Sequence, residues 1–252
     1  GAPVFGIFLY TTLGFQAVMF LDFIGAVAAV AGLTLAKIPV THDETAKKQH
    51  VIANLVDGWR AFSSNRGLVI LLLGITLVMV VFAPLGALYP LMTLEHFGGD
   101  GYMASIAEAT WGIGMLVGSA IIMAWGGGKK LARLIIVSSV IVGATTAACG
   151  FLPSTGFWAF AALNAFMAMA CAWINGPSLT LVQKNVPEEK LGRAMGFIAA
   201  LMGLTSPIGI AIGGPLADAI GVAPFFIVDG IACMIIALLL YLPRSVRTLD
   251  ER

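Results

Sequence analysis

The chain has 252 residues, of which 59% are hydrophobic and 11% are charged, and its mean hydropathy is +0.97. Soluble domains carry about 25% charged residues, so this composition excludes an ordinary globular protein. It predicts an all-α polytopic membrane protein. The net charge of +1 gives no sign of a nucleic-acid partner, and the three cysteines lie in apolar runs that predict no disulfide framework.

Apolar segments long enough to cross a bilayer follow one another along most of the chain. Residues 1–10 are too short to span and are interpreted as the end of a truncated helix, because the chain opens inside an apolar run without an initiator Met. Residues 41–66 are polar with apolar side chains at helical spacing, which predicts an amphipathic helix at the membrane surface. We expect seven complete spans, at Gly14–Ala36, Gly67–Leu91, Tyr102–Trp125, Leu131–Leu152, Phe157–Val182, Leu191–Leu216 and Pro224–Leu242.

Positive charge alternates between the connecting segments. All 14 Lys and Arg residues fall in segments 37–66, 129–133, 184–193 and 244–252. None falls in the intervening segments 95–101, 153–156 and 218–223. The positive-inside rule therefore predicts that the first set, including the C-terminus, is cytoplasmic.

A weak internal repeat relates the two ends of the chain at an offset of 207 residues. It aligns Gly6 with Gly213 and Asp22 with Asp229, together with three further identical pairs. A long period of apolar segments suggests a membrane protein built from two similar halves. We accordingly interpret residues 1–37 as the end of an N-terminal half, 38–66 as a cytoplasmic linker, 67–243 as a six-helix C-terminal half and 244–252 as a cytoplasmic tail.

Three carboxylates lie within the expected spans, namely Asp22, Glu108 and Asp229. Inserting an ionised side chain at the centre of a membrane helix costs roughly 2.5–3.5 kcal/mol, so each of these carboxylates is a candidate for a structural or functional role. Asp22 and Asp229 are repeat partners, interpreted first as interfacial anchors or as hydrogen-bond partners of a neighbouring loop. Glu108 either faces a cavity or is a hydrated structural residue near the outer surface. It shares a helical face with Met115 and has Trp111 nearby, while Gly114 and Gly118 point elsewhere and suit close helix packing.

The span 157–182 carries a second polar stripe, formed by Asn164, Met167, Cys171, Asn175 and Ser178. Amides and a soft thioether suit a pocket for varied ligands, but they suit interhelical hydrogen bonds equally well. Trp111 offers a flat apolar wall. The candidate cavity residues are therefore Trp111, Met115, Asn164, Met167 and Asn175.

The stretch 204–221 is rich in Gly and Pro yet reads as a helix. Pro207 and Pro215 each remove a helical hydrogen bond, while Gly209, Gly213 and Gly214 permit close approach and bending. The stretch either allows the helix to bend during gating or packs tightly without moving. The sequence shows no His-rich metal cluster, nucleotide-binding loop or nucleophile–base pair, so we expect no metal, no cofactor and no enzyme.

Four segments together resemble the later part of a major facilitator superfamily transporter, from about its fifth to its twelfth helix, and more narrowly the macrolide efflux group of drug:proton antiporters. These segments are ALYPLMTLEHFGG (87–99), GIGMLVGS (112–119), NGPSLTLVQKNVPEEKLGRAMG (175–196) and SPIGIAIGGPLADAIG (206–221). Pro3 and Gly6 look like the end of the antiporter signature of the fifth helix. Lys129, Lys130 and Arg193 match positions of the family's cytoplasmic loops.

The resemblance implies a two-half bundle in the plasma membrane with a central cavity, alternating access, and the missing N-terminal half as a partner. It implies that Glu108 exchanges a proton against export of an apolar or amphipathic drug-like compound. Two alternatives stay open: a facilitator that imports a polar solute, and a membrane enzyme or scaffold that transports nothing.

Overall fold

The computed structural model describes residues 65–128 and 130–251, together with Phe20, Ile24, Gly25, Val27, Trp59, Arg60 and Phe62. The chain divides into two compact units, Gly1–Gln49 and His50–Arg252. Most described residues belong to the second unit, and its architecture is given below. The predictions on Pro3, Gly6 and Asp22 lie outside the described residues, as does the first full span apart from Phe20, Ile24, Gly25 and Val27.

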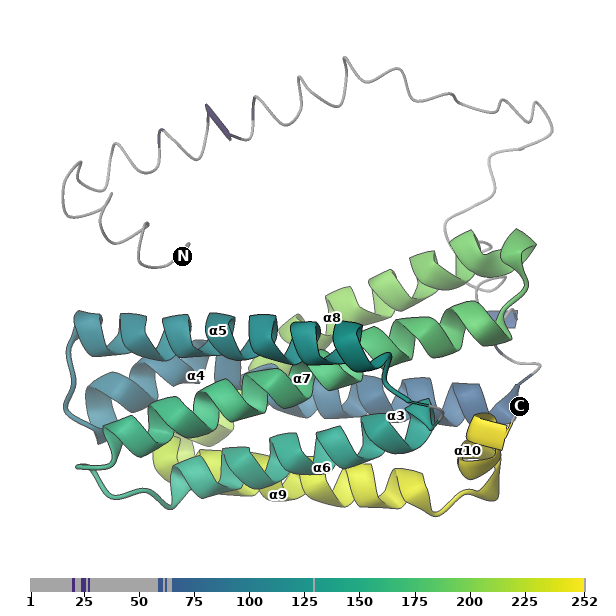
Figure 1. Cartoon of the computed structure of the whole chain (residues 1–252). Helices are drawn as coiled ribbons and strands as arrows, with labels where there is room; N and C mark the ends of the chain where they lie inside the picture. The colour runs from purple at the N-terminus through teal and green to yellow at the C-terminus, as the bar shows by residue number, and fades with distance from the viewer. Residues whose placement is uncertain are drawn as a thin grey trace. The chain divides into compact units, whose positions relative to one another are not determined.

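Every described element is a helix (Figure 1). The elements are α3 (Arg66–Phe82), α4 (Leu85–Leu91), the π-helix η1 (Met92–His96), α5 (Gly101–Trp125), α6 (Leu131–Gly150), α7 (Phe157–Asn185), α8 (Glu188–Ile220), α9 (Val222–Tyr241), α10 (Arg244–Arg247) and the 3-10 helix η2 (Thr248–Glu251). Six continuous helical segments are long and apolar enough to span a membrane, the first being Arg66–His96. They coincide with the six predicted spans after residue 66 to within a few residues, which confirms the all-α polytopic fold.

Local signals in the sequence mark where these helices begin and end. The Asn65 side chain accepts a hydrogen bond from the N–H of Leu68 at the start of α3, and Asp100 does the same for Met103 at 2.9 Å at the start of α5. Gly126, with a φ of 72°, ends α5 in the left-handed conformation that glycine adopts without strain. The short polar connections therefore set the helix boundaries that the apolar pattern predicts.

Within the first span, Ala83 and Pro84 separate α3 from α4 while keeping helical backbone angles. Proline has no backbone N–H and cannot continue the hydrogen-bond ladder of α3. The chain resumes as α4 and then widens into the π-helix η1, where the Thr93 hydroxyl donates to the Tyr89 carbonyl at 3.2 Å. Phe82, Gly86 and Tyr89, on either side of Pro84, contribute to the cavity described below.

Glycine lets two pairs of helices approach closely. On α5, a Cβ added at Gly118 would lie 2.6 Å from the Met169 carbonyl oxygen of α7, and Gly114 meets the Ala165 carbonyl in the same way. On α6, a Cβ at Gly143 would lie 2.6 Å from the Gly230 carbonyl oxygen of α9. The structure therefore confirms the close packing predicted for Gly114 and Gly118.

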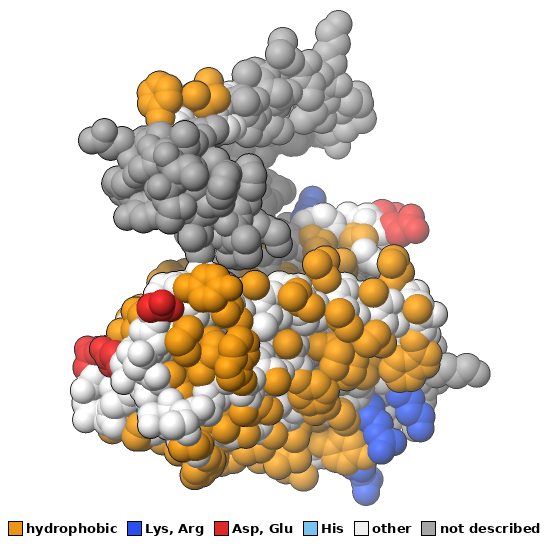
Figure 2. All heavy atoms as spheres, turned by 60° about the vertical axis from the view of Figure 1, so that its left-hand side comes forward, with side chains coloured by type: hydrophobic (Ala, Val, Ile, Leu, Met, Phe, Trp, Pro, Cys, Tyr) orange, Lys and Arg blue, Asp and Glu red, His pale blue; other side chains and the backbone are white. Residues whose placement is uncertain are grey.

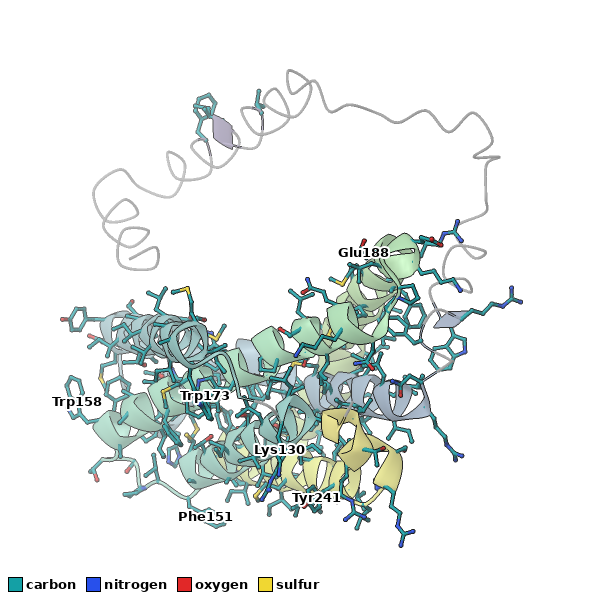
Figure 3. The ribbon with its side chains drawn as sticks, turned by 45° about the vertical axis from the view of Figure 1, so that its right-hand side comes forward. Lys130, Phe151, Trp158, Trp173, Glu188 and Tyr241 are labelled. Atoms are coloured by element: carbon teal, nitrogen blue, oxygen red, sulfur yellow. The ribbon has the colours of Figure 1, made fainter. Side chains whose placement is uncertain are left out.

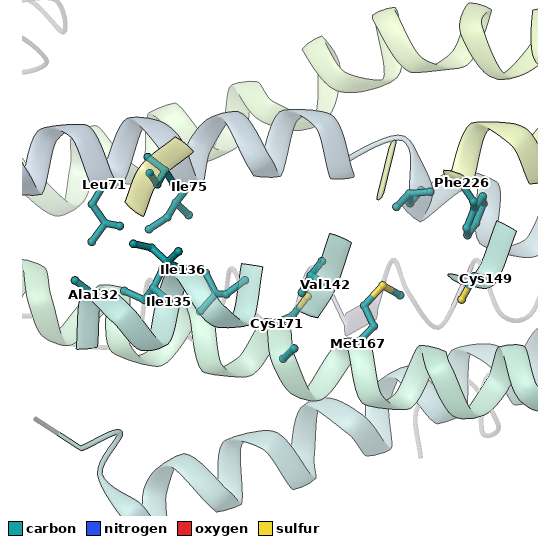
Figure 4. Close-up of a cluster of buried hydrophobic side chains, with 14 of the residues drawn as sticks. Leu71, Ile75, Ala132, Ile135, Ile136, Val142, Cys149, Met167, Cys171 and Phe226 are labelled. Atoms are coloured by element: carbon teal, nitrogen blue, oxygen red, sulfur yellow. The ribbon is translucent and has the colours of Figure 1, made fainter. Parts of the chain in front are cut away.

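A continuous apolar core fills the space between α3, α6, α7 and α9 (Figure 4). In contrast, α5 and α8 expose apolar side chains such as Leu116, Met123 and Ile212 over much of their length, and an apolar surface covers the face in Figure 2. A face of this kind requires lipid or another protein surface to cover it. Before α3, the buried Phe62 packs its ring against Phe197 of α8, so the described end of the predicted amphipathic helix contacts the bundle.

Candidate functional site

A cavity of about 260 Å³ lies between the α3–α4 break, α5 and α7, and we call it the aromatic cavity. Its lining consists of Phe82, Gly86, Tyr89, Ala107, Glu108, Trp111 and Asn164. Three of the residues proposed from sequence, Glu108, Trp111 and Asn164, thus lie around one space. Sequence reasoning missed Phe82, Gly86 and Tyr89, although their spacing of four and three residues places them on one helical face.

Aromatic rings form one wall of this cavity. Trp111 stacks on Phe82 with ring centroids 6.1 Å apart and an interplanar angle of 26°, and it lies 6.2 Å from the ring of Tyr89. Gly86 has no atom within 4 Å of where its Cβ would stand, so its lack of a side chain leaves the space open. The wall is flat and apolar, which suits a ligand with rings or a fused apolar body.

Glu108 supplies the one carboxylate in the described lining, and its side chain is exposed. It stands on α5 on a different face from Gly114 and Gly118, which pack against α7. Trp173 of α7 ties the two helices together by donating its ring N–H to the Gly118 carbonyl at 3.1 Å. The close α5–α7 contact therefore leaves the carboxylate at the cavity while another face of the helix packs.

Asn164 is buried at 1% exposure and is incompletely hydrogen-bonded. Its Nδ2 donates to the Ala107 carbonyl at 2.6 Å and to the Thr110 hydroxyl at 3.2 Å. Because the Ala107 carbonyl can only accept, the amide nitrogen must face it, and the side-chain oxygen is left without a partner. A buried acceptor of this kind calls for a donor from water or from a ligand.

The prediction that Met167 lines a cavity is wrong in this structure. Met167 is fully buried in the core, where its sulfur accepts hydrogen bonds from the Tyr89 hydroxyl at 3.3 Å and the Thr146 hydroxyl at 3.1 Å. Met115 is half-buried against the core and is not part of the cavity lining. Helical periodicity placed Met115 on the same face of α5 as Glu108 and Met167 on the same face of α7 as Asn164. It gave no information on the neighbouring helices that cover the two side chains.

Asn175 lies at a different cavity, of about 150 Å³, between α3, α7 and α8. Ser178 lines the same space, and the remaining lining is apolar. The polar stripe of α7 is therefore divided by the structure: Asn164 belongs to the aromatic cavity, Cys171 is buried, and Asn175 faces a separate space. A 29-residue helix is about 43 Å long, which explains why one stripe reaches several environments.

The Gly/Pro stretch lies inside α8, which stays helical through Pro207 and Pro215. Gly209 packs on the carbonyl of Val80, and Gly213 packs on the ring of Pro84, so both glycines seat α8 against the α3–α4 break. Gly214 has no neighbour within 4 Å of its missing Cβ. The close-packing interpretation accounts for Gly209 and Gly213, and bending of α8 stays a prediction.

Asp229 does not anchor the protein at the membrane interface, as the sequence suggested. It is 4% exposed on α9, and its Oδ2 lies 4.0 Å from the sulfur of Cys233 one turn along the helix. Helix α9 packs its Gly230 against α6 there, which draws the carboxylate into the bundle. The interpretation of Asp229 as an interfacial or loop-bonded residue is therefore wrong.

The predicted cytoplasmic loop residues are placed differently from one another. Lys130 immediately precedes α6 as its N-cap residue, in a connecting loop as expected. Arg193 was expected in a loop but lies within the second turn of α8, because the helix already begins at Glu188 after Pro187. Lys129 lies outside the described residues. The described residues contain no group of three or more His, Cys, Asp and Glu side chains that would hold a metal ion.

These features are those of a polytopic helical membrane protein with a small-molecule-sized cavity between its helices. The model of the Major Facilitator Superfamily matches residues 71–251, and the chain belongs to that family. The match covers all six described membrane helices except the first turns of α3.

The chain is 30% identical over 250 residues to macrolide efflux protein A of Streptococcus pyogenes, covering 99% of this chain and 62% of that protein. It is 30% identical over 210 residues to macrolide efflux protein A of Enterococcus faecalis, covering 83% and 65%. An uncharacterized MFS-type transporter of Bacillus subtilis, YfiS, is 29% identical over 180 residues, covering 68% and 42%. The chain thus spans less than two thirds of the curated relatives it matches, whose names are those of transporters. No solved structure matches the chain.

Proposed function

We propose that the protein to which this chain belongs exports an apolar or amphipathic drug-like compound, of which macrolides are one class, by alternating access. The observation that carries the proposal is the aromatic cavity, in which a flat wall of Phe82, Trp111 and Tyr89 stands beside the carboxylate of Glu108. Apolar pockets with few polar groups are the usual form of small-molecule sites. Two relatives whose names are macrolide efflux proteins support the direction of transport.

Glu108 is proposed to carry the exchanged proton. The carboxylate borders the cavity, so a ligand and a proton would compete for the same space. Asn164 contributes a buried oxygen without a partner, to which a hydroxyl or protonated amine of the ligand would donate. Import of a polar solute is less well supported, since the cavity wall is mainly aromatic and offers two polar side chains besides the Tyr89 phenol.

The decisive experiment measures drug efflux by the complete protein in proteoliposomes, with and without an imposed pH gradient. We expect uptake of a fluorescent macrolide into inverted vesicles only when the gradient drives protons in the opposite direction. Transport at the same rate with and without the pH gradient would contradict the proposed proton coupling. If no amphipathic compound is transported, the efflux proposal itself is wrong.

The proposed topology has its own test. Thr155 and Gln183 are exposed and stand just before and near the end of α7, about 43 Å apart along a 29-residue helix. Cysteines introduced at the two positions should react with membrane-impermeant reagents from opposite sides, with Gln183 reacting from the cytoplasm. Labelling of both from one side would overturn the orientation inferred from charge.

A further inference from the structure

A second concave site lies at the end of the bundle that the charge pattern assigns to the cytoplasm. It is a cavity of about 170 Å³ between the start of α6, the end of α9 and α10, and we call it the basic pocket. Its lining consists of Lys130, Ala132, Arg133, Ile136, Tyr241, Val246 and Arg247. Three cationic side chains thus converge on one cavity, and no carboxylate is among the described residues that line it.

The cations of the basic pocket are held by the fold. Val246 is fully buried and fixes α10 against the bundle, so that Arg247 is held beside the end of α9. The guanidinium of Arg247 lies over the ring of Tyr241, 5.6 Å from its centroid. Lys130 stands at the N-terminus of the 20-residue helix α6 as its N-cap residue. The partial positive charge of that helix end adds to the field of the side chains.

The positive-inside rule explains why this end of the bundle is basic, but it does not explain why three cations surround a cavity. Arg244 illustrates the difference, since it is exposed at the start of α10 and does not line the pocket. Figure 3 labels Lys130, at the start of α6, and Tyr241, at the end of α9, and both residues line the basic pocket. A cavity lined by three cations fits an anion with several oxygens, and arginine pairs with phosphate through two hydrogen bonds.

The surface next to the pocket is apolar. Val137 of α6 and Leu238, Leu239 and Leu242 at the end of α9 are all exposed, by 47% to 67%. Figure 2 shows basic side chains at one end of the bundle bordering such an apolar surface. An anion site next to exposed aliphatic side chains at a predicted membrane boundary matches a phosphate attached to acyl chains. A free phosphate would gain nothing from the apolar border.

We propose that the basic pocket binds the phosphate headgroup of an acidic phospholipid, whose acyl chains cover the exposed apolar side chains of α6 and α9. Basic pockets between membrane helices at the cytoplasmic side are suited to such headgroups. The site is separate from the aromatic cavity, shares no lining residue with it, and does not depend on the transport proposal.

The test compares retention of phosphatidylglycerol and of phosphatidylcholine with the same acyl chains by the purified chain in an uncharged detergent, using native mass spectrometry. We expect preferential retention of phosphatidylglycerol. Removing two of the three exposed cations, as Lys130→Gln with Arg247→Gln, should weaken its apparent affinity about 25-fold, since each cation near the membrane surface contributes about fivefold. Arg244→Gln removes a cation from the same end outside the pocket and should leave the affinity within about twofold.

Equal retention of the two lipids by the unaltered chain overturns the proposal without any variant. A loss in Arg244→Gln as large as in the double variant also overturns it, because it would show a diffuse surface charge effect. A third arm adds inorganic phosphate and follows thermal unfolding. Protection by phosphate equal to that by phosphatidylglycerol would show a free-anion site and remove the lipid part of the proposal.

Discussion

Two carboxylates within the membrane helices, Glu108 and Asp229, occupy opposite environments. Glu108 is exposed at the aromatic cavity, on the face of α5 that does not pack against α7. Asp229 is buried within the bundle on α9, near the sulfur of Cys233. Tyr89 belongs to both regions, because its ring lines the cavity and packs at 5.3 Å against Phe226, one turn before Asp229.

The comparison shows that two carboxylates with a similar expected free-energy cost in a membrane helix can differ entirely in their exposure. Glu108 is exposed at a cavity, where a proton or a ligand would meet it, whereas Asp229 is enclosed by packed side chains. We therefore assign the proposed exchange to Glu108 and a structural part to Asp229. The following changes, from the largest expected effect to the smallest, test this division.

Glu108→Gln should reduce efflux driven by a pH gradient to the level of protein-free vesicles, while folding and membrane insertion stay intact. The amide keeps the shape of the carboxyl group but does not release a proton. The measurement is drug efflux by the complete protein, normalised to protein in the membrane, with Glu95→Gln, an exposed acid outside the cavity, as the matched control. Wild-type efflux by Glu108→Gln combined with loss of efflux by Asp229→Asn would reverse the assignment.

Gly86→Phe should weaken binding of an amphipathic ligand at least about tenfold, which corresponds to ~1.4 kcal/mol. The new ring finds no atom within 4 Å of its Cβ and extends into a cavity of about 260 Å³ that the ligand would occupy. Binding is measured by ligand fluorescence. Gly192→Phe, at a site of α8 that is equally open but does not line the cavity, should bind normally. Equal binding by the two variants would place the ligand elsewhere.

Asp229→Asn should raise the apparent Tm by about 2–4 °C for each ~1 kcal/mol gained and leave pH-driven efflux unchanged. A buried carboxylate beside a thiol is costly when charged, and the amide removes that cost at the same shape. Thermal unfolding monitored in detergent gives the result. Asp218→Asn, an exposed position of α8, should not shift the Tm. A fall in Tm would show that the charge itself is stabilising.

Met167→Leu should lower the free energy of unfolding by about 1 kcal/mol and leave ligand affinity unchanged. Leucine fills the site but removes the sulfur that accepts from the hydroxyls of Tyr89 and Thr146. Met123→Leu, 83% exposed on α5, is the control and should alter neither quantity. A weaker affinity for ligand in Met167→Leu would restore Met167 to the cavity wall.

The sequence alone determined the class of the fold and the extent of its helices. Apolar length, Gly and Pro at the connections, and capping residues such as Asn65 and Asp100 are local features, so they predict spans without any knowledge of neighbours. The packing of Gly114 and Gly118 also followed from spacing. In the same way, periodicity separated the packing face of α5 from the face that carries Glu108.

Only the tertiary structure decided which residues share a cavity. Phe82, Gly86 and Tyr89 share a cavity with Trp111 because their helix packs beside α5, and Met167 is kept out of that cavity because Tyr89 of α4 and Thr146 of α6 contact its sulfur. Asp229 depends in the same way on α6, far along the chain, and Arg247 depends on Tyr241 at the end of α9. A helical period gives the direction of a side chain around its own axis, whereas burial depends on which helix stands opposite, and that is set by the packing of the whole bundle.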